Sequence, residues 1–265
     1  MGDRKALLEQ YKPWGLAWKL ISPPTTGTSA CKRFFETWAK TNNLLAFILR
    51  MSVHITEASK AAKEYFQKYG EEEIFKDLES VSIPVDILKK HLQLLFELLV
   101  CRHVDNYLTY LSNLLSEAFR LRPELLRSNA KVEVDMILQH KSLDDLISVL
   151  AERKIQKLAY EPFTQVVRFF KSRLDLEIAG EEDLSRLTEA IEIRNISVHN
   201  ACVINRRYMQ RLRLDSSLIG TMKRLNIENV EPLAIVLGDL VKDIDEAACK
   251  KLGLASKDFT IDPME

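Results

Sequence analysis

Apolar side chains recur every three or four residues through most of this chain, and this spacing constrains the fold more than any other feature. The clearest run begins at Leu44 and continues to Tyr65, and a second begins at Leu88 and reaches about Phe119. Such spacing places the apolar side chains on one face of an α-helix. Glycine and proline, which interrupt helices, number only eight each in 265 residues. No Asn-Gly or Asp-Gly turn separates alternating segments, so the sequence predicts an all-α protein.

The run that starts at Leu44 covers three heptads, and its later positions, such as Ala58 and Ala62, are small. We therefore expect this face to pack into the core of the protein and not to form a coiled coil. The helix is expected to end near Gly70.

A break at Ser82-Ile83-Pro84 marks the expected domain boundary. The sequence thus predicts a helical N-terminal region over residues 1–82, a larger helical domain over 83–255 and a C-terminal tail over 256–265. About 30 irregular residues open the N-terminal region. Their Trp14 and Trp18 are expected to pack onto the body of the protein, with contact to a partner as the alternative.

Within the larger domain, helix-breaking residues separate the apolar runs. A long helix is expected to end at Arg122-Pro123, and the last helix near Gly253. Between them, Ser142 is expected to cap one helix and Pro162 to open the next. A further helix is predicted from about Leu184 to Val203 or beyond.

Bulk composition excludes few functions. Lysine plus arginine and aspartate plus glutamate each number 38, so overall charge neither favours nor opposes nucleic acid. No apolar run is long enough to cross a membrane, and the charged N-terminus is not typical of a secretion signal. Scattered cysteines argue against a zinc site or a disulfide framework, and they fit a reducing, cytoplasmic location. These cysteines are Cys31, Cys101, Cys202 and Cys249.

Motifs for common cofactors are missing from the sequence. The chain contains no His-Glu-x-x-His, no Walker loop and no Gly-x-Gly-x-x-Gly, so we expect neither catalytic zinc nor a bound nucleotide cofactor. Four histidines have no partner at metal-binding spacing and are expected at the surface or hydrogen-bonded in the core. They are His54, His91, His103 and His140.

The most distinctive polar residues lie in Arg194-Asn195-Ile196-Ser197-Val198-His199-Asn200. Histidine changes charge near neutral pH and can transfer protons, and arginine presents a permanently charged fork that fits phosphate oxygens. On an ideal helix Glu192, Asn195 and His199 share one face, whereas Arg194 lies roughly 140° from His199. Arginine is long enough to reach around the helix, or a second copy of the helix can complete the site across a two-fold axis.

The charge balance changes just after this motif. The segment 205–224 is rich in cations, contains the single acid Asp215 and places Tyr208 among the arginines. Its cations are Arg206, Arg207, Arg211, Arg213, Lys223 and Arg224. A local excess of positive charge beside a candidate phosphodiester site favours binding of an RNA backbone. Taken alone, these residues are equally consistent with solvated arginines that pair with acids elsewhere.

The motif 194–200, followed by Val203-Ile204-Asn205 and Tyr208, resembles the Arg-Asn-x-x-x-His signature of the HEPN superfamily. The bare arginine-to-histidine spacing is common, but the asparagine, the helical context and the trailing residues make the resemblance more specific. It covers about residues 85–255 and implies a HEPN-like helical bundle. Similar members often have a glycine two or three residues beyond the histidine, where this chain has Ala201-Cys202.

HEPN domains are commonly homodimeric, and many are metal-independent endoribonucleases of toxin and defence systems. The resemblance implies that His199 moves the proton of the ribose 2′-hydroxyl or of the leaving 5′-oxygen, and that Arg194 stabilises the phosphorane. Asn195 would orient His199 or a phosphate oxygen, and Glu192 would steer the imidazole. The products would be a 2′,3′-cyclic phosphate and a 5′-hydroxyl. The implied partners are RNA and a second copy of the chain, with no metal and no other cofactor.

Other interpretations stay open. An arginine, an asparagine and a histidine on one helix equally suit a polar network at a helical dimer seam. The chain would then be a non-catalytic dimerisation or adaptor module in a regulatory or defence assembly. A further possibility is a toxin that an antitoxin partner holds inactive.

Overall fold

The computed structural model describes residues 22–69, 84–127 and 132–261. The predicted lead-in tryptophans, Trp14 and Trp18, and the predicted boundary between residues 82 and 83 lie outside these ranges. The described residues form long α-helices, shorter helical turns and one pair of two-residue strands. The predicted all-α class is therefore confirmed.

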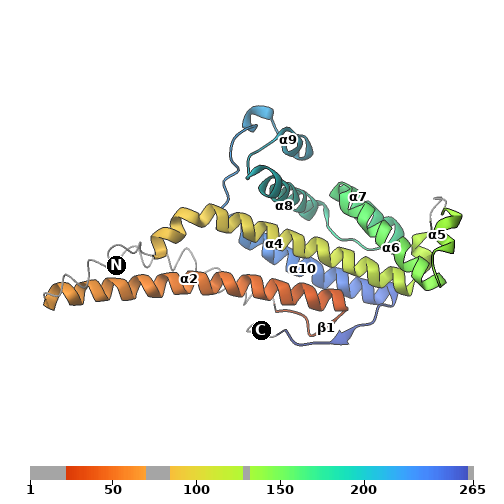
Figure 1. Ribbon diagram of the computed structural model, residues 1–265, viewed down its shortest axis with the longest axis horizontal. Helices are drawn as coiled ribbons and strands as arrows, with labels where there is room; N and C mark the ends of the chain where they lie inside the picture. Colours follow the sequence, from red (N-terminus) through yellow and green to blue (C-terminus); the bar gives the residue numbers. More distant parts are fainter. Residues whose placement is uncertain (1–21, 70–83, 128–131, 262–265) are drawn as a thin grey trace.

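Three long helices form the body of the molecule (Figure 1). Helices α2 (Ser29–Tyr69) and α4 (Pro84–Leu121) lie side by side, and α10 (Ile227–Leu252) packs against both. Helix α4 also contacts α6 (Leu143–Tyr160) and α8 (Glu181–Asn200). Side chains from all five helices share one apolar core, so α4 connects the body to the helices that cover it.

Shorter elements join these helices. They are η1 (Pro123–Leu126), α5 (Val134–Leu138), α7 (Phe163–Phe169), the π-helical turn η2 (Phe170–Leu174), α9 (Arg206–Leu212) and η3 (Ser216–Leu218). Strand β1 (Thr26–Gly27) pairs antiparallel with β2 (Lys257–Asp258), and the backbone N–H of Phe259 donates to the carbonyl of Thr25 (2.8 Å). The first residues of the predicted tail therefore run back along the segment that precedes α2.

Several helix ends confirm the signals in the sequence. The Ser142 hydroxyl accepts the backbone N–H of Asp145 (3.1 Å) at the start of α6, and Pro162 precedes α7. Helix α4 ends at Leu121, and Gly253 follows α10 with a φ of 74° that suits glycine. These signals depend on neighbouring residues alone, which explains why the sequence reveals them.

The predicted core face of α2 is wrong. Leu44 is 60% exposed and Ile55 is 43% exposed, whereas side chains one position further along the helix are buried. The buried set includes Trp38, Asn42, Leu45 and Leu49. The helix begins at Ser29, well before the apolar run, and the Trp38 indole N–H donates to the carbonyl of Ala234 (3.0 Å) on α10. This earlier turn sets the rotation of the helix, which leaves the Leu44 face toward solvent.

A buried carboxylate holds the ends of the three long helices together. Asp245 of α10 accepts hydrogen bonds from the backbone N–H of Thr28 (2.9 Å) and from the Tyr110 hydroxyl (3.3 Å) of α4. Thr28 also caps α2, because its Oγ1 accepts the backbone N–H of Cys31 (3.1 Å). Burial raises the pKa of Asp245, and the hydrogen bonds from Thr28 oppose that rise.

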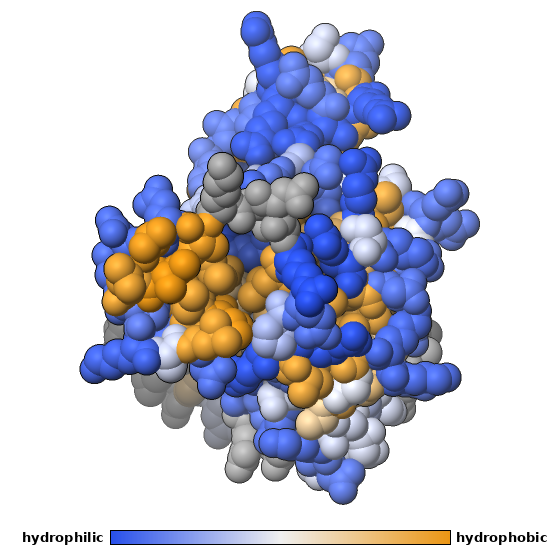
Figure 2. Space-filling model, turned by 90° about the vertical axis from the view of Figure 1, so that its right-hand side faces the viewer, coloured by the Kyte–Doolittle hydropathy of each residue, from blue (hydrophilic) through white to orange (hydrophobic). Residues whose placement is uncertain are grey.

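The face of the molecule drawn in Figure 2 is mostly polar, with local apolar patches. Figure 2 shows apolar side chains gathered on one side of the end of the molecule that α5 and the start of α6 form. Exposed Val134, Leu138 and Leu143 belong to these elements. None of the described helices is long and apolar enough to span a bilayer.

His103 makes the stability of the fold depend on pH. Its side chain is 1% exposed, and Nε2 has no hydrogen-bond partner among the described residues. Burial, aided by the charge of Arg102, lowers the pKa of His103 to about 4. In the unfolded chain the pKa is about 6.5, so between these values only the unfolded state binds the proton. The His103 contribution to stability is complete above pH ~6.5 and is lost as pH falls toward 4.

We expect the free energy of unfolding to decrease by about 3 kcal/mol between pH ~6.5 and pH ~4 through His103 alone. Urea unfolding at a series of pH values measures this change. His103→Gln, which does not titrate, serves as the control and should lose less stability over the same range. Parallel pH profiles for the two proteins would contradict the prediction.

Candidate functional site

Helix α8 presents the motif residues on a surface supported by α4. Three acids in its first turn, Glu181, Glu182 and Asp183, stabilise the positive end of the helix dipole. The apolar side chains along the helix are buried, and they include Leu187, Ala190, Ile193 and Ile196. Arg194 and Asn195 are half-buried and His199 is exposed. The motif therefore lies at the edge of the core, where its polar groups can reach a ligand.

Helix α8 ends directly after the motif, at Asn200, and not at Val203 or beyond as the sequence predicts. Ala201 and Cys202 both have left-handed backbone conformations, with φ of 46° and 59°. The N–H of Cys202 donates to the carbonyl of Ile196 (3.0 Å), which closes the helix end. Glycine adopts this conformation without strain, so Ala201 and Cys202 carry a steric cost here that glycine would not.

Arg194 is held by two neighbours. Its Nε donates to Oδ1 of Asp105 on α4 (2.8 Å), and its Nη1 donates to Oδ1 of Asn195 (3.2 Å). An arginine has five N–H donors, so donors remain for another ligand. The Arg194 side chain is only partly exposed, which makes this ion pair more persistent than one in open solvent.

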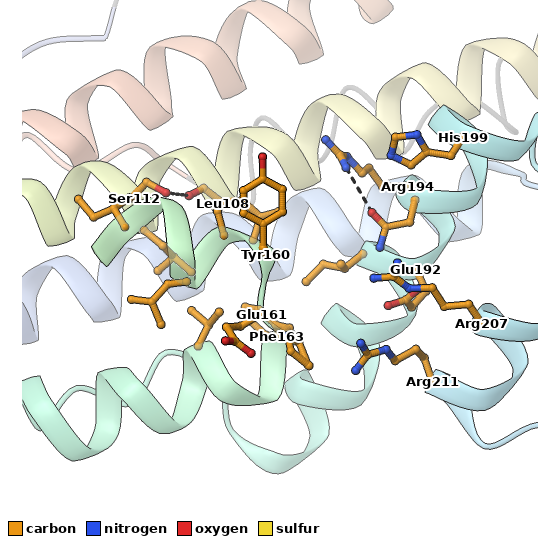
Figure 3. Close-up of a pocket in the computed structure, with 18 of the residues that line it drawn as sticks. Leu108, Ser112, Tyr160, Glu161, Phe163, Glu192, Arg194, His199, Arg207 and Arg211 are labelled. Carbon is orange, nitrogen blue, oxygen red and sulfur yellow. Dashed lines mark hydrogen bonds between the residues drawn. The ribbon is translucent and has the colours of Figure 1, made fainter. Parts of the chain in front are cut away.

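The motif lines a pocket of about 630 Å³, which we call the α8 pocket (Figure 3). Helices α4, α6, α7, α8 and α9 contribute to its walls, together with η2 and the turn between α6 and α7. The predicted site residues in its lining are Glu192, Arg194, Asn195, His199, Arg207 and Arg211. Arg194 and His199 line the same pocket within one chain. The roughly 140° that separates them on an ideal helix is therefore overcome by the length of the arginine.

Apolar side chains make up the wall opposite the motif. They include Leu108 of α4, Ile155 and Leu158 of α6, and Phe163 of α7. Tyr160, which also lines the pocket, is 91% exposed and ends α6. The α8 pocket thus combines an apolar wall that can pack against a flat ring with a cationic wall that can bind an anion.

Glu192 lies inside the α8 pocket, away from His199. The two residues are seven positions apart on α8, which is about 10 Å along the helix axis. Glu192 is 6% exposed, and no hydrogen bond or ion pair joins it to any described residue. The expectation that Glu192 steers the imidazole therefore has no contact to support it.

Only some of the predicted RNA-binding residues line the α8 pocket. Arg207 and Arg211 line the α8 pocket, whereas the exposed Arg206 and Arg213 do not. Tyr208 is 2% exposed and belongs to the core, so it offers no face to an RNA base. That part of the prediction has no exposed ring to support it. The Asn205 side chain caps α9 by accepting the N–H of Tyr208 (2.9 Å), and in this first turn Tyr208 faces the core whereas Arg206 and Arg207 are exposed.

Sequence reasoning missed several residues of the site. Asp105 comes from a helix 89 positions earlier in the chain, and only tertiary structure pairs it with Arg194. Tyr160 gives no signal beyond its position before Pro162.

Next to the α8 pocket lies a smaller hollow of about 310 Å³, which shares Leu158 and Glu161 with it. Its cations are Lys154, Lys157 and Arg168. The spacing of the two lysines on a predicted helix was the one available signal.

Searches for metal sites and for related proteins gave no further assignment. The described residues contain no group of three or more His, Cys, Asp or Glu side chains that could hold a metal ion. Comparison with protein-family models, curated proteins and solved structures found no match to this chain. The resemblance to the HEPN superfamily therefore rests on the motif and stays a prediction.

Ala201, which follows α8, has a left-handed backbone conformation, so we expect its replacement by glycine to stabilise the protein. Ala201→Gly should raise the free energy of unfolding by about 1 kcal/mol, because glycine removes the steric penalty of a left-handed alanine. Ala201 is exposed, so the change leaves no cavity. Chemical denaturation measures the effect. The control is Ala247→Gly in the interior of α10, which should lower stability by about 1 kcal/mol. A loss of stability in both variants would refute the argument.

Proposed function

We propose that this chain is a metal-independent endoribonuclease that cleaves RNA by attack of a ribose 2′-hydroxyl on the adjacent phosphate. The supporting observation is that Arg194, Asn195 and His199 line one pocket together with two further arginines. RNA is the proposed substrate because DNA lacks the attacking 2′-hydroxyl.

The proposed reaction uses one proton-transfer group and one fixed cation. His199 takes the proton of the 2′-hydroxyl as O2′ bonds to phosphorus, and returns a proton to O5′ as the P–O5′ bond breaks. This leaves a 2′,3′-cyclic phosphate and a 5′-hydroxyl. Arg194 stabilises the charge of the phosphorane with the N–H donors that its neighbours leave free. A permanent cation in this position serves in place of a metal ion.

The contacts of Arg194 support a preorganised role. Asp105 and Asn195 fix the guanidinium before any substrate arrives, so little reorganisation is needed during the reaction. Asn195 in this scheme orients the arginine directly, in addition to the role toward His199 or phosphate that the resemblance implies.

The resemblance also suggests the biological setting. We propose a toxin or defence effector that acts as a homodimer, with an antitoxin or another defence protein as a further partner. Because Arg194 and His199 line one pocket in a single chain, dimerisation is not required to bring them together.

Cleavage of a labelled RNA in EDTA tests the proposal. His199→Ala should lower the rate by about 10²–10⁴, and Arg194→Ala by at least about 10². The cleaved 5′ fragment should end in a 2′,3′-cyclic phosphate. His54→Ala on α2 and Arg186→Ala on α8, both exposed, are the matched controls and should retain full activity. Equal cleavage by all five proteins would remove the motif from the mechanism.

The salt dependence of RNA binding tests the cationic wall. Arg207→Ala and Arg211→Ala should each weaken binding and reduce the slope of log K against log salt by about 1, because each removes a phosphate contact. Fluorescence anisotropy of a labelled single-stranded RNA measures both quantities. Arg213→Ala, exposed on the same segment but outside the pocket, is the control. If Arg213→Ala has the same effect, the arginines act only as diffuse charge.

A non-catalytic adaptor is the second candidate function. The observation that favours it is the ion pair between Arg194 and Asp105, which a purely structural network would also contain. RNA left intact at high protein concentration, together with unimpaired self-association of His199→Ala, would favour this alternative.

A further inference from the structure

Glu192 is the one buried ionisable group of the α8 pocket that the proposed cleavage step does not use. It is 6% exposed, it lines the pocket, and no described residue donates a hydrogen bond to it. In Figure 3 its carboxylate lies within the pocket on the side of Arg207, and no ion pair joins the two. The Glu192 side chain opens into the cavity and no described residue donates to it, so its two oxygens are available to accept N–H groups of a ligand.

The surroundings of Glu192 define the shape and chemistry of that ligand. The opposite wall is apolar, with Leu108, Ile155 and Phe163 facing the cavity, and Tyr160 stands exposed at the same pocket. Apolar and aromatic walls of this kind suit a flat heteroaromatic ring. Arg207 and Arg211 line the same pocket from α9, where they can bind a phosphate attached to that ring's sugar.

We propose that the α8 pocket binds a guanine base of the RNA, with the two oxygens of Glu192 accepting hydrogen bonds from N1–H and from the 2-amino group. This assignment rests on the proposed function, because it names the nucleotide that the same site recognises. Guanine is the only standard base with two adjacent N–H donors on its Watson–Crick edge, which match the two oxygens of a carboxylate.

The other bases fit the carboxylate poorly. Adenine and cytosine each place a ring-nitrogen acceptor beside their amino group, and that acceptor repels the second carboxylate oxygen. Uracil offers one N–H between two carbonyl oxygens. A pocket whose polar group is left unpaired rejects such analogues strongly, whereas apolar walls alone discriminate weakly.

Binding of 3′-mononucleotides to the full chain tests the assignment by calorimetry. Wild-type protein should bind 3′-GMP about 30-fold more tightly than 3′-AMP. Binding of 3′-IMP, which keeps N1–H and lacks the 2-amino group, should fall between them. Glu192→Gln should bring the affinities for 3′-GMP and 3′-AMP within about threefold of each other. Glu161→Gln, at an exposed carboxylate of the same pocket, should keep the wild-type preference.

Equal affinities of the wild type for 3′-GMP, 3′-IMP and 3′-AMP would overturn the assignment without any need for a variant. An unchanged preference in Glu192→Gln would also overturn it. The outcomes separate the two proposals. Guanine-selective binding without cleavage of RNA would contradict the nuclease proposal alone. Cleavage that depends on His199, with no preference of the wild type for guanosine, would contradict the guanine assignment alone.

Discussion

The packing of the three long helices at one end of the molecule depends on the buried carboxylate of Asp245. A carboxylate that leaves water is stable only when donors surround it, and here the donors come from the segment before α2 and from α4. A one-turn slip of either long helix against α10 would remove at least one of these donors from the carboxylate. Space is equally restricted, because a side chain at Gly27 would place its Cβ 2.8 Å from an oxygen of Asp245. This cluster therefore fixes the register of three helices that are far apart in the sequence.

Helix α4 connects the three packed long helices to the candidate site, because it contacts α2 and α10 as well as α6 and α8. Its Asp105 accepts a hydrogen bond from Arg194 on α8. Its Gln93 side chain donates to the carbonyl of Lys223 and accepts the backbone N–H of Leu225. The first contact holds the cation of the motif, and the second holds the loop that follows α9. Two of the helices that line the α8 pocket, α6 and α8, thus pack on the same helix. Preorganisation of this kind is what electrostatic stabilisation of a transition state requires.

Local features of this structure were predictable, and relationships between elements were not. The cap at Ser142, the glycine after α10 and the end of α4 before Arg122-Pro123 follow from near neighbours in the sequence, and all of them are present. The buried face of α2 was not predictable, because Trp38 sets its rotation through a contact with α10. Tyr208 was misjudged for the same reason, since charge in the surrounding segment says nothing about which way one turn faces. The motif itself was recognisable, yet the pairing of Arg194 with Asp105 depends on tertiary structure.

The α8 pocket contains both cationic side chains and a carboxylate, and the two affect ligand binding differently. Cations on α8 and α9 attract any polyanion, but they do so without regard to sequence, because every nucleotide carries the same phosphate. A carboxylate in the same cavity acts in the opposite way. It weakens binding of every ligand that cannot offer donors to it, and so converts a general affinity into a selective one. Glu192 occupies that position with Arg207 and Arg211 around the same cavity. A pocket that holds only phosphate gains nothing from a carboxylate in its lining, so the presence of Glu192 argues that part of the ligand is a donor-bearing ring.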